Sequence, residues 1–400
     1  MKRDPIKLNN PEKYATVPVI APEKIDKAIE TALKRLDRMG RKYGMKFPGT
    51  AAYNSQYLWG ANKNWGCGMY AGCYWTALFI SKKISFFSQM ALALTKTFDE
   101  REKNKVGMDN HDVGFAFSPS SVAAYKVTGV REYRDTALSA AKYFYDHSYS
   151  KEGRFIIRGW NWKEKYGFEE AGYRTMMDSM MNVPLLYWAA KETGNEEYFK
   201  AAHDHVKTTE ELLIRADSSS FHHYQFDPET HGPKYGVTLQ GRSDDSCWSR
   251  GHAWGIYGFP IAYSYDKSDF IKEVHHDITY FMLNHLPDDM IPYWDYDFVD
   301  GDEPRDSSAG AISVCGLFEM ARMLDDNDPD KTIFRSAAVQ LLEALIDKCT
   351  DLDERDDGLI NHVTAALPQK AGIDQTAVYG DFFYLEALAR YKDPDFKMFW

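Results

Sequence analysis

Two aspartates, Asp112 and Asp178, stand where a carboxylate would be partly buried. Asp112 lies in the segment NHDVGFAF and Asp178 in RTMMDSMMNVPLLYW, each just ahead of or within a strongly apolar stretch. Burial raises the pKa of a carboxylic acid, and a second carboxylate nearby raises it further, so such a pair can hold a proton to donate near neutral pH. Paired carboxylates commonly cleave glycosidic and related C–O bonds. Because the chain has 59 acidic residues, spacing alone does not single out this pair.

A second group of residues suits an acidic sugar. In SCWSRGHAWGIYGF, Arg250 and Trp254 are four residues apart and so share one face of a helix start. An Arg guanidinium can hold a carboxylate through charge-assisted hydrogen bonds while an indole stacks on the sugar ring. The alternative is an Arg-Trp pair that only packs. Trp65, Trp160 and Trp162 are open to the same two interpretations, as core residues or as sugar platforms.

The segment 217–245 is too long and too rich in His, Tyr and Gly for an ordinary connection, which favours a functional role. Its adjacent histidines, His222 and His223, point in different directions and have no third ligand at a suitable spacing. We therefore expect hydrogen bonds to a sugar or to the backbone of the segment rather than a metal site.

These residues must be positioned by helices. Apolar residues at three- and four-residue steps predict a first helix from Pro22 to about Gly40 or Gly44. Asn195 and Asp328 stand at N-cap positions. Strand signals are weak. Further helices are predicted near 66–83, 84–100, 112–128, 131–148, 175–193, 196–215, 246–265, 268–287, 307–325, 330–348 and 378–391, about twelve in all.

Polar or aromatic residues recur just before, or in the first turn of, every second predicted helix, about one helix pair apart. If six inner helices lie parallel in a ring, these residues meet at one end of it, as in sites built by barrels. The alternative is that each acid only caps its helix, and we expect this of Asp306 and Asp381. The series is Trp65, Asp112, Asp178, Asp245 with Arg250, Asp306 and Asp381.

Composition limits the remaining possibilities. No linker divides the 400 residues, so we predict one domain, 21–400, after an N-terminal arm, 1–20. A net charge of -11 without a basic run argues against a nucleic-acid partner. The five scattered cysteines are expected to be reduced and buried. No stretch resembles a signal core or a membrane span, so we expect a cytoplasmic protein, or a periplasmic one if a leader precedes this sequence.

The motifs together resemble the unsaturated glucuronyl hydrolases, glycoside hydrolase family 88. This resemblance implies an all-α fold, the (α/α)6 barrel, and removal of a Δ4,5-unsaturated uronic acid from the non-reducing end of lyase-generated oligosaccharides. In such a reaction C4 is protonated and water adds at C5, and the resulting hemiketal rearranges and expels the aglycone. The matching segments are NWGCGMYAGCYW, NHDVGFAF, MMDSMMNVPLLYWAAKETG, SFHHYQFDPET, LQGRSDDSCWSRGHAWGIYGF, PYWDYDF with RDSSAGAIS, and YGDFFYLEALARY.

The resemblance also implies residue roles. Asp178 takes the place of the family's acid/base and Asp112 that of its second essential carboxylate. Lys370, in NHVTAALPQKAGID, is a candidate for contacting sulfate on the second sugar. Neither a metal nor an organic cofactor is expected, and the partner is a small oligosaccharide. Substrate-contact positions fall on Trp65, His111, His222, Gln240, Arg250 and Trp254.

Three other functions remain open at this point. One is an unsaturated rhamnogalacturonyl hydrolase or an ordinary inverting glycosidase on the same barrel, which should lack the arginine of RGHAW. The second is an inactive sugar-binding protein, against which the retention of both Asp112 and Asp178 argues. The third is an epimerase, which would need convergent histidines, and only His111 and His222 are placed for that.

Overall fold

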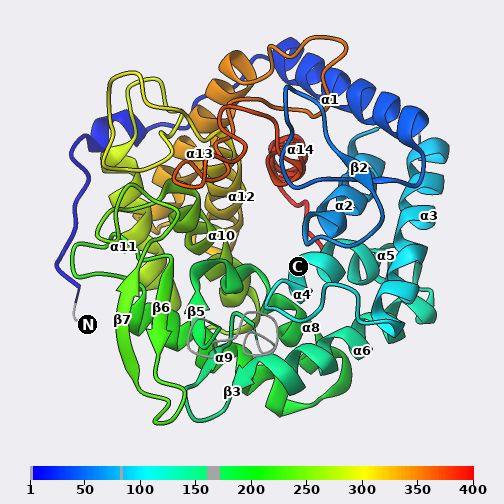
Figure 1. The fold of residues 1–400 in the computed structure, drawn as a ribbon. Coiled ribbons are helices and arrows are strands. Elements are labelled where there is room, and N and C mark those ends of the chain that lie inside the picture. The colour runs from blue at the N-terminus through cyan, green and yellow to red at the C-terminus, as the bar shows by residue number, and fades with distance from the viewer. Residues whose placement is uncertain (1–2, 82–83, 160–171) are drawn as a thin grey trace.

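The computed structural model describes residues 3–81, 84–159 and 172–400, and it is mostly helical (Figure 1). Six inner helical units are α2 (Gly66–Ile80), α4 (Val113–Phe117) continued by a π-helical segment (Ser118–Val122) into α5 (Ala123–Thr128), α8 (Pro184–Thr193), α10 (Ser249–Tyr265), α12 (Ser307–Met323) and α14 (Val378–Lys392). Six outer helices are α1 (Pro22–Tyr43), α3 (Ile84–Lys103), α6 (Arg131–Ser148), α9 (Glu196–Leu212), α11 (Asp269–His285) and α13 (Pro329–Lys348).

The inner units close a ring. Helix α2 packs on α4, α4 on α8, α8 on α10, α10 on α12, α12 on α14, and α14 returns to α2. Each outer helix packs on inner neighbours, and Figure 1 shows α1, α3 and α6 on the outside of the ring. Taking α4 to α5 as one helix, the described ranges give six inner and six outer helices. The predicted all-α fold, an (α/α)6 barrel, is confirmed.

Sequence explains which helices lie inside. Helix α12 is apolar or small around almost its whole circumference and is buried along nearly all of its length. Helix α1 buries only one stripe, which includes Ile25, Ile29 and Leu36, and is polar elsewhere. Gly316 lets α12 approach α10 closely, because a Cβ there would lie 2.3 Å from the carbonyl oxygen of Ile256. Any larger residue at this position would push the two inner helices apart.

Two predicted helices differ from the structure near the aspartates. The helix predicted near 112–128 is interrupted by the π-helical segment, whose second residue, Pro119, has no N–H to donate. The helix predicted near 175–193 starts late: strand β5 (Arg174–Met176) and a 3-10 turn (Met177–Met181) come first, and α8 begins only at Pro184. Proline fits the first turn of a helix, where its missing N–H is not needed, so α8 can begin at Pro184.

Segment 217–245 is not a simple loop. It contains strands β6 (His223–Phe226) and β7 (Pro233–Val237), which form an antiparallel sheet in the order β5-β6-β7. Met176 of β5 faces His223 of β6, and Met177 N donates to His222 O at 2.8 Å. The sheet therefore fixes the His222 segment beside the turn that carries Asp178. Our expectation of few strands missed this pairing, because each strand is too short to show a clear alternation.

The predicted helix caps are confirmed. Asn195 accepts a hydrogen bond from Glu197 N at 3.1 Å, and Asp328 accepts one from Asp330 N at 3.0 Å. All five cysteines are buried and unpaired, as expected. Among the described residues, no helix is both long and apolar enough to span a membrane.

Residues before α1 run along the outer helices. Tyr14 is buried, Gln340 of α13 donates to Lys13 O at 2.9 Å, and Arg3 forms ion pairs with Glu210 of α9 and Asp277 of α11. The arm thus ties three outer helices together.

Candidate active site

Three predicted site residues meet at the end of the barrel where the inner helices begin. His111 Nε2 lies 3.0 Å from Asp178 Oδ1 and 3.4 Å from Asp112 Oδ1. Asp112 stands at the N-cap of α4, and Asp178 lies in the 3-10 turn after β5. Their side chains are 19% and 15% exposed, against 4% for His111. A substrate can therefore reach both carboxylates, with the imidazole held between them.

The other ring nitrogen of His111 determines where a proton sits. Nδ1 lies 3.1 Å from the carbonyl oxygen of Arg158. A carbonyl only accepts, so Nδ1 must carry a hydrogen. Nε2 then faces Asp178 either as a second N–H of an imidazolium or as an acceptor from a protonated carboxyl group. One proton is therefore shared between His111 Nε2 and Asp178.

Electrostatics favour the imidazolium in the free protein. Burial lowers the pKa of His111, but Asp112 and Asp178 outweigh it and the net shift is upward. Burial would raise the pKa of Asp178, yet the charge and hydrogen bond of His111, followed by His222 and Arg158, hold that pKa below its ordinary value. Our expectation that burial raises the pKa of both carboxyl groups is thus wrong for Asp178.

Asp112 behaves as the sequence led us to expect. Burial raises its pKa, and the charge of Asp178 adds to the effect, while His111 and Arg158 oppose it incompletely. The two carboxyl groups therefore have opposite shifts, which is how one site can hold an acid and a base at the same pH.

His222 supports the same pair from the sheet. Its Nε2 lies 3.9 Å from Asp178 Oδ2, and its ring contacts the Trp248 indole at a centroid distance of 4.6 Å. Burial lowers the pKa of His222 to about 4, with the charges of His111 and Arg250 adding to the effect. A neutral His222 can thus offer a hydrogen bond without adding charge.

Arg250 is buried and held by the protein itself. It forms an ion pair with the fully buried Asp306 and donates to Thr364 O at 2.8 Å. Its guanidinium carbon lies 4.5 Å from the Trp248 ring centroid and 4.9 Å from that of Tyr379. Asp306, at the N-cap position of α12, therefore does more than cap a helix.

The expected partner of Arg250, Trp254, lies elsewhere. The Trp254 ring packs on Phe115 and Phe383, with centroids 5.2 and 5.6 Å apart. The indole that stacks on the guanidinium is Trp248, which sequence reasoning missed although it stands two residues before Arg250. Trp254 itself is buried, so its contacts fit the packing interpretation.

An aromatic series joins the remaining predicted residues to the carboxylate pair. Trp65 stacks on Tyr379 at 5.3 Å and 17°, and Tyr379 in turn lies over Arg250. Arg250 contacts Trp248, which contacts His222 beside Asp178. Tyr379 is a second residue that sequence reasoning missed. A ring-shaped ligand could lie along this series from Trp65 to Asp178.

Gln240 and Asp381 are not joined to this cluster by any contact among the described residues. Gln240 lies between β7 and α10, where its backbone N donates to Thr238 O at 2.6 Å. Asp381, which we expected to cap α14, lies inside that helix and accepts from Leu359 N at 2.6 Å and from the Tyr57 hydroxyl at 2.7 Å. Asp381 therefore holds the loop at Leu359 and the side chain of Tyr57 in place. Trp160 and Trp162 lie outside the described residues.

The central cluster could also hold a metal. Among the described residues, only His111, Asp112 and Asp178 bring three possible ligand atoms within 4.8 Å of one another. An imidazole with two carboxylates fits several divalent ions, and an Nδ1–H bonded to a carbonyl is common in metal-bound histidines. A proton on Nε2 accounts for the same geometry. The absence of a metal stays a prediction.

Comparisons with known proteins indicate the family of this chain. The family model described as Glycosyl Hydrolase Family 88 matches residues 37–391. An unsaturated chondroitin disaccharide hydrolase of Streptococcus pneumoniae is 36% identical over 98% of both chains. The unsaturated glucuronyl hydrolase of Streptococcus agalactiae superposes with a TM-score of 0.93 at 34% identity over 100% of both chains.

A mutant of that S. agalactiae enzyme, solved in complex with dGlcA-GalNAc6S, superposes with a TM-score of 0.85 at 32% identity and the same coverage. The family match covers most of the chain, and the likenesses extend from end to end. The chain is therefore a glycoside hydrolase and belongs to Glycosyl Hydrolase Family 88.

Proposed function

We propose that this enzyme removes the Δ4,5-unsaturated uronic acid from the non-reducing end of lyase-generated oligosaccharides, with glycosaminoglycan-type disaccharides favoured. The observation that carries the proposal is the pair Asp112 and Asp178 bridged by His111 Nε2. The likeness to an unsaturated chondroitin disaccharide hydrolase supports the choice of substrate class.

The cluster can supply the proton that this chemistry requires. In the free protein the shared proton lies on His111 and Asp178 is charged. A uronate carboxylate bound nearer to Asp178 than to His111 raises the pKa of Asp178 by more than that of the imidazolium, so the proton moves from Nε2 to Oδ1. Asp178 then donates it to C4, while Asp112 orients the uronate and takes part in the charge balance.

Water completes the reaction. Its oxygen adds to C5, and its proton returns to the carboxylate cluster, so the enzyme is regenerated. The hemiketal at C5 opens to a ketone, and the hemiacetal left at C1 expels the aglycone as an alcohol. One water is consumed for each bond cleaved, and no group other than the cluster has to hold a proton.

The direct experiment follows the loss of ultraviolet absorbance of the conjugated uronate. The enzyme is mixed with unsaturated disaccharides of chondroitin, hyaluronan, heparin and alginate type. We expect turnover of at least one glycosaminoglycan type and faster turnover of these than of the alginate type. Absence of turnover with all four disaccharides would contradict the proposed function.

Arg250 is proposed to hold the uronate at the edge of the Trp248 and Tyr379 rings. Arg250→Ala should mainly raise KM, because a charge-assisted contact to the carboxylate exists in the ground and transition states alike. Steady-state kinetics on the preferred disaccharide measures it. Arg242→Ala is the control, because Arg242 is 58% exposed and pairs with Asp297. An unchanged KM in Arg250→Ala would assign Arg250 to packing against Asp306 alone.

Lys370 is proposed to contact sulfate on the second sugar. It is exposed, and its neighbour Gln369 donates to Leu239 O at 3.3 Å, which holds this loop against the segment of Gln240. Lys370→Ala should lower kcat/KM for a 6-sulfated disaccharide more than for the unsulfated one. Equal losses on both would show that Lys370 does not contact the sulfate.

We propose further that residues 21–400 act as one catalytic unit and that the arm, 1–20, serves to brace it. Five buried thiols without a disulfide suit a reducing compartment, which supports the cytoplasm as its location.

A further inference from the structure

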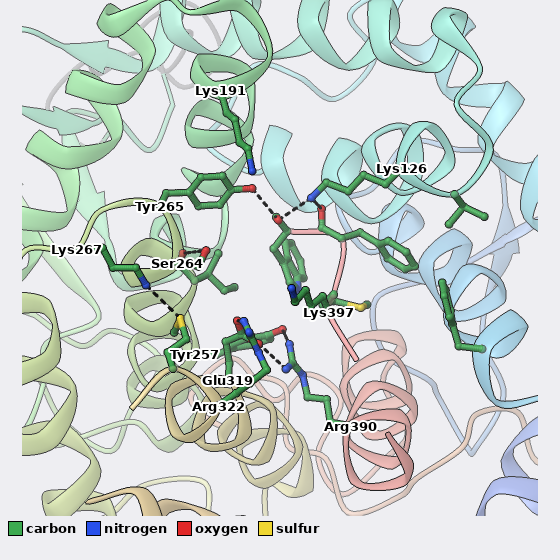
Figure 2. A pocket seen from close by; sticks show the side chains of 17 residues that line it. Lys126, Lys191, Tyr257, Ser264, Tyr265, Lys267, Glu319, Arg322, Arg390 and Lys397 are labelled. Carbon is green, nitrogen blue, oxygen red and sulfur yellow. Dashed lines mark hydrogen bonds and ion pairs between the residues drawn. The ribbon is translucent and has the colours of Figure 1, made fainter. Parts of the chain in front are cut away.

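A cavity of about 720 Å³ lies at the far end of the barrel from Asp112 and Asp178 (Figure 2). It is lined where α5, α8, α10, α12 and α14 end, whereas the candidate active site lies where inner helices begin. Along α10, Arg250 and the cavity-lining Tyr265 are roughly 22 Å apart at a rise of about 1.5 Å per residue. The cavity contains none of the predicted site residues. We call it the basal pocket.

Charge in the basal pocket is opposite to that of the whole chain. The protein has a net charge of -11, yet the described residues lining the pocket include six cationic side chains and a single acidic side chain, that of Glu319. Figure 2 shows these side chains around a common space. The six cations are Lys126, Lys191, Lys267, Arg322, Arg390 and Lys397.

The two arginines are neutralised by acidic side chains. Arg390 pairs with Glu319 and Glu386, and Arg322 pairs with Glu319. Among the described residues, no acidic side chain forms an ion pair with any of the four lysines lining the pocket. Lys126 donates to the main-chain oxygens of Phe399 and Trp400, at 2.9 and 3.0 Å, so it already has acceptors.

This surplus of positive charge affects the pKa of Lys126. Its side chain lines the pocket and is exposed there. The surrounding protein removes part of the water around the ammonium group, and this desolvation, with the charge of Lys191, lowers the pKa of Lys126 to about 8. An anion entering the pocket would relieve both lysines.

The floor of the pocket also holds N–H donors without an acceptor. The side chain of Trp400 is 6% exposed, and within the described part of the chain its Nε1 has no hydrogen-bond partner. The Nε of Arg322 is likewise buried and has no hydrogen-bond partner within the described part of the chain. Buried donors normally find a partner, so an acceptor in the cavity, whether water or a ligand oxygen, would satisfy both groups.

Helix dipoles explain some of this charge but not all of it. Lys126, Lys191, Arg322 and Arg390 stand in the last turns of their helices, where a cation offsets the negative end. Lys267 and Lys397 lie outside helices, and dipole compensation accounts neither for the cavity nor for the buried donors.

We propose that the basal pocket binds a small polyanion that carries at least two phosphate or sulfate groups. Three lysines, Lys191, Lys267 and Lys397, have no oxygen acceptor among the described residues and match a charge of at least two on the ligand, whose oxygens would also accept from Trp400 and Arg322. The volume lies inside the range of roughly 300 to 1,000 Å³ typical of small-molecule sites. The site is separate from catalysis and does not depend on the proposed function.

Calorimetric titration of the whole protein tests this with two probes, inorganic pyrophosphate and a saturated disulfated disaccharide. We expect one equivalent of at least one probe to bind, and about tenfold weaker binding after Lys191→Gln with Lys397→Gln. Both lysines are exposed, so the double variant should fold. The matched control, Lys142→Gln with Lys200→Gln, changes two outer-helix lysines paired with Asp146 and Asp204.

A second readout tests the place of binding. If the anion raises the pKa of Lys126 from about 8, binding of the disulfated disaccharide, which does not itself titrate near pH 8, takes up about half a proton at that pH. The uptake is measured as a difference in binding enthalpy between buffers of unlike ionisation enthalpy. Binding of pyrophosphate alone identifies phosphate as the ligand chemistry, and binding of the disaccharide alone identifies sulfated sugars. Failure of both probes to bind, or equal losses in the double variant and the control, would overturn the proposal.

Discussion

Asp178→Asn is expected to lower kcat by a factor of about 100 or more, since general acid catalysis typically contributes at least that much. Substrate affinity should change by only a few-fold. An asparagine side chain can still accept from His111 Nε2, which lies 3.0 Å from Oδ1, so the local geometry survives while the transferable proton is lost. Single-turnover kinetics and equilibrium binding of the preferred disaccharide separate the two effects.

The matched control for that variant is Asp245→Asn. Asp245 belongs to the same series of acids ahead of inner helices, but it is exposed and lies outside the cluster around His111. Its activity should be unchanged. If Asp178→Asn kept more than about a tenth of the activity, Asp178 could not be the acid, and Asp112, whose pKa is raised, would be the next candidate.

The sequence predicted the helices well, for physical reasons. Helical periodicity and caps are local signals, so α9 and α13 start where Asn195 and Asp328 indicated. The β5-β6-β7 sheet was missed because pairing between Met176 and His223 joins segments far apart in the chain. A strand of three or four residues is too short for its alternation of apolar and polar side chains to indicate the strand with which it pairs.

The site was predicted in part. Residue types and spacing alone did not single out the carboxylate pair, which the resemblance of the motifs indicated, and His111 and His222 do meet Asp178. Sequence alone could not show that Asp306 pairs with Arg250, since 56 residues separate them. Nor could it show whether Trp248 or Trp254 stacks on the guanidinium. That depends on the backbone conformation at Trp248, the residue just before α10.

Saturated glucuronides should be inert, and this is the second large effect we expect. Without the C4=C5 double bond there is no enol ether for Asp178 to protonate. The comparison uses an unsaturated disaccharide and its saturated counterpart with the same aglycone, and release of the aglycone is measured for both. Cleavage of the saturated compound at comparable kcat/KM would indicate an ordinary glycosidase, in which the two carboxylates act at the anomeric carbon.

Turnover in heavy water tests the central claim, that a proton delivered to C4 starts the reaction. The released product is analysed by mass spectrometry and NMR for deuterium at C4. If the shared proton of His111 and Asp178 passes to C4, every product molecule carries one solvent-derived deuterium there. Early samples that hold a released sugar with its C4=C5 double bond intact, with deuterium reaching C4 only afterwards, would contradict the account, because attack at the anomeric carbon leaves the double bond in place until the freed ring opens and ketonises.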